Sequence, residues 1–353
     1  MATSIRIAVD AMGGDQGPPV AVAGAARALA RLEGRDVRFR LHGDPGRVEA
    51  ELARHPALRG ACEVAPAEKV IAGDEKPAQA LRRGKGSSMW GALEDVKTGA
   101  AQAAVSGGNT GALMAISKLL LRMTGSLDRP AIVASWPTLR GVTSVLDVGA
   151  NIECDADQLI EFAVMGEAFH RAVHMRGEGA PAVGVLNVGS EDQKGHEEVR
   201  EAHRRLRSGA APIRYHGFVE GDDIARGTVE VVVTDGFTGN AVLKTGEGLA
   251  RFFAQTLRET LTGDPLAMVG GLLARGALQK MRARLTPPGG GPLLGLNGVV
   301  IKAHGGADAA GFADALVIAH DLAASDYAGE IARNMAAVAA APPAPVAVEE
   351  ARA

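Results

Sequence analysis

The stretch DGFTGN at residues 235–240 follows a run of valines at Val229 and 231–233 and precedes a helical pattern. A short run of β-branched apolar residues is typical of a buried parallel strand. Where such a strand ends in small and polar residues and a helix begins, free backbone N–H groups and the positive end of the helix dipole point at one spot. The stretch therefore predicts a strand–turn–helix unit with an anion site at its turn.

Turns of the same kind recur along the chain. They are DAMGGD at 10–15, SGGNTG at 106–111, DVGAN at 147–151, NVGS at 187–190 and KAHGG at 302–306. In an open parallel sheet such turns line up along the carboxyl edge of the strands, where ligands bind. A single glycine-rich turn is a weak signal, because glycine also serves simply to end a strand. Together, the turns predict one shared polar cleft.

Strands and helices alternate along most of the chain, which predicts an α/β fold with a doubly wound, mainly parallel sheet and helices on both faces. The expected strands are 5–9, 37–41, 101–105, 131–135, 143–148, 183–188, 213–219, 229–233 and 298–303. The main expected helices are 21–32, 112–121, 159–172 and 307–334.

The rhythm changes after Lys244, where two helices over 249–261 and 266–285 are expected to form a protruding hairpin. Residues 286–292 are expected to form a Pro/Gly-rich loop. The predicted domains are a catalytic α/β domain of residues 1–248 and 286–335, a helical hairpin of residues 249–285 for dimerisation and membrane contact, and a disordered Ala/Pro-rich tail of residues 336–353.

Composition argues against several classes of protein. The chain has 353 residues, a net charge of −3, and only 8 Phe, 2 Trp and 2 Tyr, so no nucleic-acid partner is expected. Cys62 and Cys154 lie far apart without CxxC spacing, as expected for free thiols in a reducing cytosol. Neither a signal peptide nor a long apolar segment precedes or interrupts the strands, which favours a cytoplasmic protein.

Known catalytic motifs are also missing. The chain contains no HExxH, GxSxG or GxxxxGK[ST] motif, and residues 10–15 do not fit the dinucleotide fingerprint GxGxxG. No cofactor and no metal are expected, and a covalent serine or cysteine mechanism has no support. The glycine-rich turns favour anion binding, which can hold phosphate and stabilise a developing oxyanion. The residues thus predict a phosphate-handling α/β enzyme.

The turns at 10–15, 106–111, 147–151, 235–240 and 302–305 together resemble the motifs of the bacterial PlsX phosphate acyltransferases. The matching stretches run in the expected order from residue 5 to residue 306 and include VIAGDEKP at 70–77, Arg82 and SSM at 87–89. The resemblance implies transfer of an acyl group from acyl-[acyl carrier protein] to inorganic phosphate, giving acyl phosphate for phospholipid (phosphatidic acid) synthesis. It also implies a fold similar to phosphotransacetylases and isocitrate/isopropylmalate dehydrogenases. Phosphate itself would attack the thioester, so no covalent enzyme intermediate is expected.

The resemblance further implies a homodimer that associates peripherally with the inner face of the cell membrane, with a membrane glycerol-3-phosphate acyltransferase as a further partner. The hairpin fits this picture, and the expected membrane contacts are Leu266, Met268, Val269, Leu272 and Leu273. An apolar tip beside basic residues suits a lipid interface. It equally suits a dimer contact or ordinary core packing.

Site residues follow from the same motifs. Lys302 and His304 are expected to stabilise the oxyanion or protonate the leaving thiolate, with Asn240 gripping phosphate and Asp235 orienting these groups. The expected substrate-binding residues are Gly13, Gly14, Asp15, Asn109, Thr110, Gly111, Asn151, Lys194, Thr238 and Gly239.

A basic rim must receive the acidic carrier protein. The first candidates are Arg82, Arg83 and Lys85, and the second are Arg200 and Arg204.

Two other functions remain open on the sequence. One is a phosphotransacetylase-like enzyme that uses acyl-CoA, and the other is a non-catalytic, membrane-docked scaffold. A dehydrogenase is a weaker third option because the nucleotide fingerprint is absent.

Overall fold

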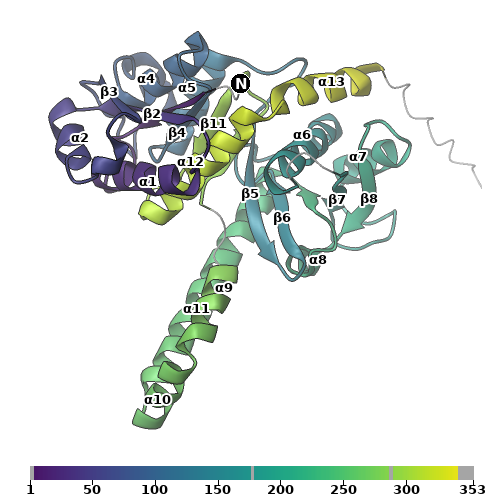
Figure 1. The fold of residues 1–353 in the computed structure, drawn as a ribbon. Coiled ribbons are helices and arrows are strands. Elements are labelled where there is room, and N and C mark those ends of the chain that lie inside the picture. The colour runs from purple at the N-terminus through teal and green to yellow at the C-terminus, as the bar shows by residue number, and fades with distance from the viewer. Residues whose placement is uncertain (1–3, 176–178, 286–288, 341–353) are drawn as a thin grey trace, which may run out of the picture.

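The computed structural model describes residues 4–175, 179–285 and 289–340. An 11-stranded sheet, in the order β3-β2-β1-β4-β11-β10-β5-β6-β9-β7-β8, carries helices on both faces, and a helical hairpin projects from it (Figure 1). The strands are β1 (Ile5–Asp10), β2 (Val37–Gly43), β3 (Cys62–Pro66), β4 (Ala103–Ser106), β5 (Ala131–Thr138), β6 (Gly141–Leu146), β7 (Ala182–Leu186), β8 (Arg214–Val219), β9 (Val231–Val233), β10 (Gly291–Leu294) and β11 (Val299–Lys302).

The helices connect and cover these strands. They are α1 (Pro18–Arg31), α2 (Pro45–Leu52), α3 (Pro77–Arg83), α4 (Ser88–Thr98), α5 (Thr110–Leu121), α6 (Ala156–His174), α7 (Glu197–Arg207), α8 (Gly221–Arg226), α9 (Gly236–Thr262), α10 (Pro265–Leu273), α11 (Arg275–Leu285), α12 (Ala309–Ala324) and α13 (Tyr327–Ala340), with a short 3-10 helix η1 (Pro56–Leu58).

The first half of the sheet is parallel. Strands β3, β2, β1, β4 and β11 all run in one direction. Helices α1 and α12 cover one face of this half and α4 and α5 the other, so β1 and β4 are buried on both sides. This explains why both strands are almost continuously apolar in sequence.

The direction of the strands reverses in the middle of the sheet. Strand β10 is antiparallel to both β11 and β5, and β5 is antiparallel to β6. Strands β6, β9, β7 and β8 then run parallel to one another. Only Leu139 and Arg140 separate β5 from β6, a connection that an antiparallel hairpin allows and a parallel crossover does not. The mainly parallel α/β sheet with helices on both faces is confirmed, with this reversal at its centre.

The helices after residue 235 differ from the expected ones. Helix α9 is one continuous helix of 27 residues, so the helix that begins at the DGFTGN turn is also the first arm of the hairpin. Gly246 does not break it, because the Trp136 indole fills the space where a Cβ would lie. The second arm is two helices, α10 and α11, rather than one.

The C-terminal helix is also divided. Ser325 adopts an extended conformation that ends α12, and its hydroxyl accepts a hydrogen bond from the N–H of Tyr327, where α13 begins. Helix α13 continues to Ala340, so residues 336–340 are helical. Residues 341–353 of the expected tail and 286–288 of the expected loop lie outside the described residues, and β10 occupies 291–294.

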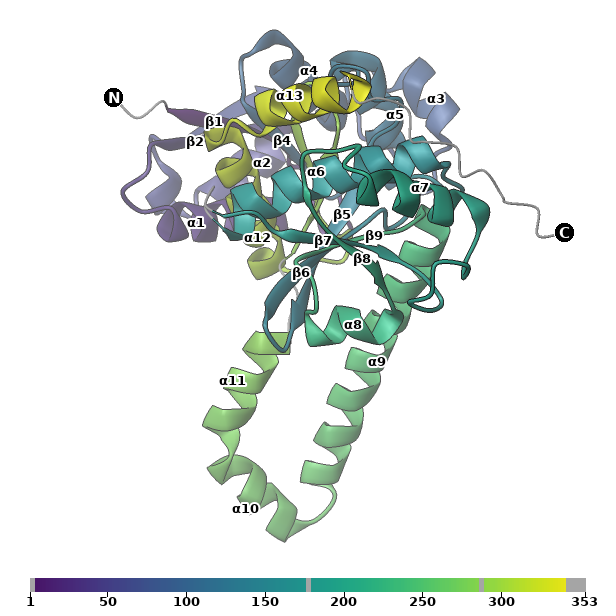
Figure 2. The ribbon, with the colours of Figure 1, turned by 90° about the vertical axis from the view of Figure 1, so that its right-hand side faces the viewer.

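The hairpin of α9, α10 and α11 stands away from the body in two perpendicular views (Figures 1 and 2). Its apolar side chains are exposed, and the largest are Leu249, Phe252, Phe253, Leu257, Leu266, Met268, Val269, Leu272, Leu273, Met281 and Leu285. Among the described residues, no helix is both long and apolar enough to cross a membrane.

Candidate functional site

The polar turns fall into two groups at the ends of the strands. The α1 group comprises residues 10–17, 106–109 and 302–306, at the carboxyl ends of β1, β4 and β11. The α9 group comprises residues 147–151, 187–195 and 235–240, at the carboxyl ends of β6, β7 and β9. The names refer to the helices that begin at residues 18 and 236.

Strand β10 shows why the two groups are separate. One end of β10 pairs with Lys302 of the α1 group through Gly291, and its other end pairs with Ala131 through Leu294. Next to Ala131, the N–H of Ile132 donates to Asp147 of the α9 group over 3.0 Å. The expected single row of turns along one carboxyl edge is therefore wrong, because the central strands reverse direction. No hydrogen bond within the described part of the chain links the two groups.

The α1 group is tightly packed around Asp10. This carboxylate is buried and accepts hydrogen bonds from the Ser106 hydroxyl (2.6 Å) and the N–H of Gly13 (3.1 Å). A Cβ on Gly13 would lie 2.4 Å from the Asp10 carboxylate and 2.7 Å from the nitrogen of Gly108. Glycine is thus required at position 13, because the turns at 10–17 and 106–109 come too close there to admit a side chain.

Lys302 belongs to the same cluster. Its ammonium donates to the carbonyl oxygens of Gly107 (3.4 Å) and Ala303. Burial lowers the pKa of Lys302 to about 8, although the charges of Asp10 and Asp15 act to raise it. The charges of two carboxylates thus act on this lysine and partly offset its positive charge.

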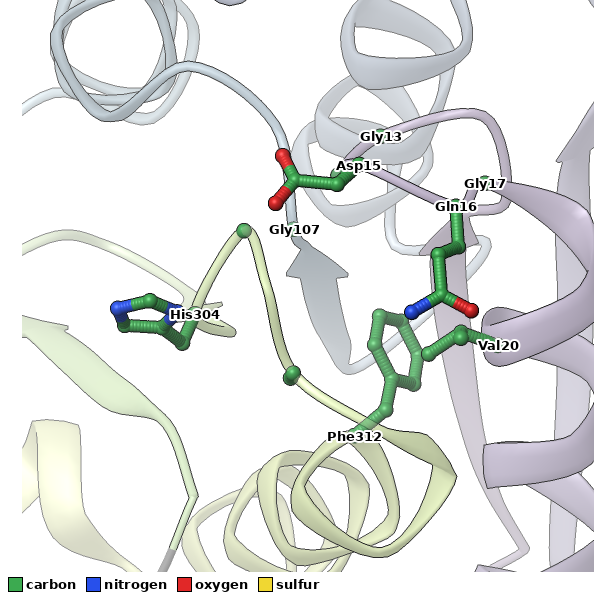
Figure 3. A pocket seen from close by; sticks show the side chains of 11 residues that line it. Gly13, Asp15, Gln16, Gly17, Val20, Gly107, His304 and Phe312 are labelled. Atoms are coloured by element: carbon green, nitrogen blue, oxygen red, sulfur yellow. The ribbon is translucent and has the colours of Figure 1, made fainter. Parts of the chain in front are cut away.

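A small hollow lies beside this cluster (Figure 3). Asp15 and His304 lie on facing loops at its rim, and the N–H of Asp15 donates to the carbonyl oxygen of Gly305 over 2.9 Å. The Nδ1 atom of His304 accepts a hydrogen bond from the N–H of Gly306 (3.1 Å). Helix α1 begins with two prolines, Pro18 and Pro19, which have no N–H. The expected anion site at Gly13, Gly14 and Asp15 therefore lacks those helix donors.

The side chain of Asn109 is also fully hydrogen-bonded to the protein's own backbone. Its Oδ1 caps α5 by accepting from the N–H of Ala112 (3.0 Å). Its Nδ2 donates to the carbonyl oxygens of Ala72 (3.3 Å), Gly73 (2.9 Å) and Glu75 (2.9 Å). The side chain that was expected to grip phosphate thus holds the 70–77 loop against α5, and the neighbouring Thr110 is exposed.

In the α9 group, Asp147 organises the loop that follows β6. The carboxylate is fully buried and accepts from the N–H groups of Ile132 (3.0 Å), Gly149 (3.2 Å), Ala150 (3.0 Å) and Asn151 (2.6 Å). Burial raises the pKa of Asp147, and the hydrogen bonds from Ile132, Ala150 and Asn151 act in the opposite direction. The amide of Asn151 donates to Asp147 (3.0 Å) and to the carbonyl oxygen of Pro130 (2.9 Å), so both side chains stabilise the loop.

The first turn of α9 packs directly onto this loop. The N–H of Gly236 donates to the carbonyl oxygen of Asn151 over 2.7 Å. A Cβ on Gly236 would lie 2.4 Å from that oxygen, and a Cβ on Gly239 would lie 1.9 Å from the carbonyl oxygen of Asp147. Asp235 caps the helix, accepting from the N–H and the hydroxyl of Thr238, both at 2.8 Å. Asp235 and Thr238 are thus partners of each other.

Asn240 and Lys194 are two of the exposed polar side chains of the α9 group; Ser190, Glu191 and Gln193 are others. Asn240 is exposed and lies next to Gly149, whose Cβ position is 3.6 Å from the Asn240 side chain. Lys194 is exposed, and its stem lies over Gly189, with Cγ 3.4 Å from the Cβ position of that glycine. In the described ranges neither side chain makes a hydrogen bond or an ion pair. Asn240 thus offers an uncommitted amide at the start of α9, and Lys194 offers an uncommitted ammonium on the loop that follows β7.

Cys154 lies close to the same loop, which its place in the sequence did not indicate. Its thiol donates to the carbonyl oxygen of Asn151 over 3.9 Å. Burial raises the pKa of Cys154 to about 12, with the charges of Asp147 and Asp235 acting in the same direction. A thiol with so high a pKa is a poor nucleophile at neutral pH.

The two expected carrier-docking clusters differ in charge. Arg82, Arg83 and Lys85 are exposed at the end of α3 and form no ion pair within the described ranges. Arg200 pairs with Glu197, and Arg204 pairs with Glu197 (3.0 Å) and Glu201 (2.6 Å) along α7. The second cluster is therefore largely neutralised by its own helix.

Comparison with solved structures defines the class of fold. The chain is similar to a phosphotransacetylase from Streptococcus pyogenes (TM-score 0.60, 17% identity, covering 91% of this chain and 94% of that one). It is also similar to the EutD phosphotransacetylase from Staphylococcus aureus (TM-score 0.58, 16% identity, 91% and 95%). A 4-hydroxythreonine-4-phosphate dehydrogenase from Klebsiella pneumoniae shares the fold (TM-score 0.51, 16% identity, 92% and 99%).

Comparison of sequences defines the family. Residues 5–329 match the family model described as "Fatty acid synthesis protein". The chain is 64% identical to the phosphate acyltransferase of Caulobacter vibrioides, over 95% of this chain and 92% of that protein, and 58% identical to that of Phenylobacterium zucineum, over 98% and 99%. The chain belongs to the phosphate acyltransferase family of fatty acid and phospholipid synthesis, whose members are acyltransferase enzymes. The resemblance found in the sequence motifs is confirmed.

Proposed function

We propose that this chain transfers the acyl group of an acyl-[acyl carrier protein] to inorganic phosphate and that the reaction takes place at the α9 group. The observation that carries the location is the contrast in available groups. In the α1 group, Lys302 faces two carboxylates and α1 begins with prolines. In the α9 group, Asn240 is exposed at the start of α9 and Lys194 is exposed on the loop after β7.

The chemistry needs no enzyme nucleophile. An oxygen of hydrogen phosphate attacks the thioester carbonyl, an acyl C–O bond forms, and the C–S bond breaks. The proton of hydrogen phosphate balances the thiolate, so the products are acyl phosphate and the free thiol of the carrier. The enzyme must hold phosphate beside the carbonyl and stabilise the oxyanion that forms during attack. The raised pKa of Cys154 supports a direct attack, because no thiolate lies ready at this edge.

Lys194 and Asn240 are assigned to these tasks. The Lys194 ammonium would neutralise charge on phosphate, and the Asn240 amide would donate to phosphate or to the oxyanion. Asp147, Asn151, Asp235 and Gly239 would position them, because these residues fix the loop and the first turn of α9. Lys302 and His304, expected at first to be catalytic, would instead stabilise the α1 group.

The docking surfaces follow from exposure and charge. The cluster of Arg82, Arg83 and Lys85 would receive the acidic carrier, because its positive charges are unpaired within the described ranges. Surfaces that are acidic, or whose basic residues already pair with acidic neighbours, attract the carrier less. The arms of two hairpins would pair in a homodimer and bury Phe252 and Phe253, which are exposed in the single chain. The tip would contact the inner face of the cytoplasmic membrane, near a glycerol-3-phosphate acyltransferase that consumes the product.

The test is release of carrier thiol from palmitoyl-[acyl carrier protein] with and without phosphate, with acyl phosphate trapped by hydroxylamine. Asn240→Ala and Lys194→Met should each lower kcat by roughly 10²-fold to 10³-fold, the usual effect of losing an oxyanion donor. Lys302→Met is the matched control at the α1 group and should retain the rate to within about fivefold. The opposite ranking, with Lys302→Met inactive and Asn240→Ala active, would move the reaction to the α1 group.

The two other functions give different results in the same assay. A phosphotransacetylase-like enzyme would release thiol from acyl-CoA and not from the carrier thioester. A non-catalytic scaffold would release none from either substrate while remaining folded and bound to vesicles.

A further inference from the structure

The α9 group exposes apolar side chains as well as polar ones. Ile152 is 74% exposed, Val188 is 77% exposed and Phe237 is 70% exposed. Each follows a different strand, because they lie after β6, after β7 and at the start of α9 after β9. We call these three residues the apolar patch.

The backbone brings the three residues together. The hydrogen bond from Gly236 to Asn151 joins the residues that immediately precede Phe237 and Ile152. Strand β7 pairs with β9 up to Val185 and Val233, where the two strands lie about 5 Å apart, so the segments that carry Val188 and Phe237 leave the sheet from neighbouring strands.

The apolar patch alternates with the available polar groups. Ile152 follows Asn151, Val188 precedes the Gly189 over which Lys194 lies, and Phe237 is on the same helix turn as Asn240. A few placed polar groups within an apolar surface are the usual make-up of a small-molecule site. Exposed apolar side chains beside a polar site in a soluble fold indicate a ligand that covers them.

We infer that Ile152, Val188 and Phe237 form the surface that receives the acyl chain of the substrate and sets the preference for chain length. The inference rests on the proposed function, since it takes the reacting carbonyl to lie beside Asn240 and Lys194. The chain of an acyl group held there leaves the carbonyl directly onto the apolar patch.

Distance from the hairpin tip argues against lipid as the occupant. Helix α9 begins at the apolar patch and runs away from it for 27 residues, which is about 40 Å at 1.5 Å per residue. A bilayer touching α10 at the tip would therefore lie far from the start of α9 (Figure 2).

The first experiment compares octanoyl, dodecanoyl and palmitoyl carrier thioesters in the phosphate-dependent reaction. Each methylene that leaves water is worth roughly threefold to fourfold in transition-state binding, so kcat/KM should rise with chain length in the wild type. Phe237→Ala should lower the palmitoyl-to-octanoyl ratio of kcat/KM by about tenfold and leave the octanoyl reaction within about twofold. Ile152→Ala should act in the same direction with a smaller effect, and Leu139→Ala, which removes a side chain of equal exposure (74%) at the far end of β5, should change nothing.

Two results would overturn the inference. One is an equal loss at every chain length, which would mean that Phe237 supports the polar site. The other is dissociation of an oligomer by Phe237→Ala in sedimentation, which would mean that a second copy of the chain covers the apolar patch.

A binding experiment separates this inference from the proposed function. Alkyl phosphonates of eight to sixteen carbons, used below their micelle concentrations, carry a phosphate-like head and a chain but cannot react. Calorimetry should show tighter binding with each added methylene in the wild type and a weaker dependence in Phe237→Ala. If the wild type releases no thiol but binds longer phosphonates more tightly, the proposed reaction is wrong and the inference about the apolar patch is supported. If binding of the phosphonates does not depend on chain length, the apolar patch fails whatever the activity.

Discussion

The α1 group and the α9 group share one sequence pattern, but their polar side chains differ in bonding and exposure. Both begin at the carboxyl end of a buried strand and both contain glycines that a Cβ would drive into a neighbouring backbone, as at Gly13 and Gly239. In the α1 group the buried Asp10 accepts hydrogen bonds from Ser106 and Gly13, and the charges of Asp10 and Asp15 act on Lys302. In the α9 group Asn240 and Lys194 stay exposed.

The difference shows that a glycine-rich polar turn indicates close packing of the backbone and does not by itself indicate a ligand site. A glycine is required wherever two turns meet at less than van der Waals distance, whether or not a ligand binds there. A ligand site is distinguished by exposed polar side chains that have no hydrogen-bond partner within the protein. The following changes test this contrast, from the largest expected effect to the smallest.

The first change is Gly239→Val at the contact between α9 and the 147–151 loop. The new side chain would begin 1.9 Å from the carbonyl oxygen of Asp147, so α9 would have to move. We expect a loss of about 3–5 kcal/mol in the free energy of unfolding, measured with urea. The control is Gly248→Ala in the same helix, where no heavy atom lies within 4 Å and stability should rise by about 0.5–1 kcal/mol. An unchanged urea midpoint for Gly239→Val would show that this contact is loose.

The second change is acidification, which should weaken the half of the sheet behind the α9 group. His170 and His174 lie on α6 and bond to the hydroxyls of Ser144 and Ser135, both at 2.9 Å. Burial lowers the pKa of each histidine from 6.5 to about 4. Below pH 6.5 these histidines are protonated in the unfolded chain, whereas in the folded protein they stay neutral down to about pH 4. The free energy of unfolding therefore falls across this window by up to about 3 kcal/mol per histidine.

Replacing both histidines by asparagine should flatten this pH dependence, as measured by thermal unfolding between pH 7 and pH 4. The exposed His216 provides the control, since His216→Asn should leave the curve of the wild type unchanged. An equally steep loss in the double variant would assign the acid sensitivity to the carboxylates.

The third change is Lys302→Met in the α1 group. Burial lowers the pKa of Lys302 from 10.5 to about 8, so the folded protein releases this proton before the unfolded chain does. The stability of the wild type relative to the variant should therefore rise by up to about 3 kcal/mol between pH 8 and pH 10.5. Urea unfolding of both proteins at matched pH values measures the difference, and parallel curves would mean that Lys302 is not buried in solution.

The fourth change reverses charge on the two basic clusters. Arg82→Glu with Arg83→Glu should raise the KM for the carrier protein by roughly threefold to tenfold, because these arginines have no acidic partner in the described ranges. Arg204→Glu should raise it by less than about twofold, because Glu197 and Glu201 already neutralise that face. Equal effects of the two changes would show that the carrier spans both halves of the molecule.

Much of the fold was predictable because it is local. The valine run before Asp235 predicts β9, and the capping residue and the two glycines after it predict the start of α9. Buried parallel strands demand apolar runs, and helix starts demand caps, so both leave their mark in a few neighbouring residues. The continuity of α9 was missed because Gly246 counts against a helix until Trp136, 110 positions earlier in the chain, is seen to fill its empty face.

The sequence by itself determined the family, the α/β class and the positions of the turns, since strand and helix patterns and motif order are properties of neighbouring residues. Only the tertiary structure decided which turns share an edge of the sheet. The strand direction is reversed by β10 and by the short connection between β5 and β6, and a pairing between distant strands leaves no local trace. For the same reason, only the structure showed that the Asn109 side chain bonds to the 70–77 loop, whereas the Asn240 side chain is exposed.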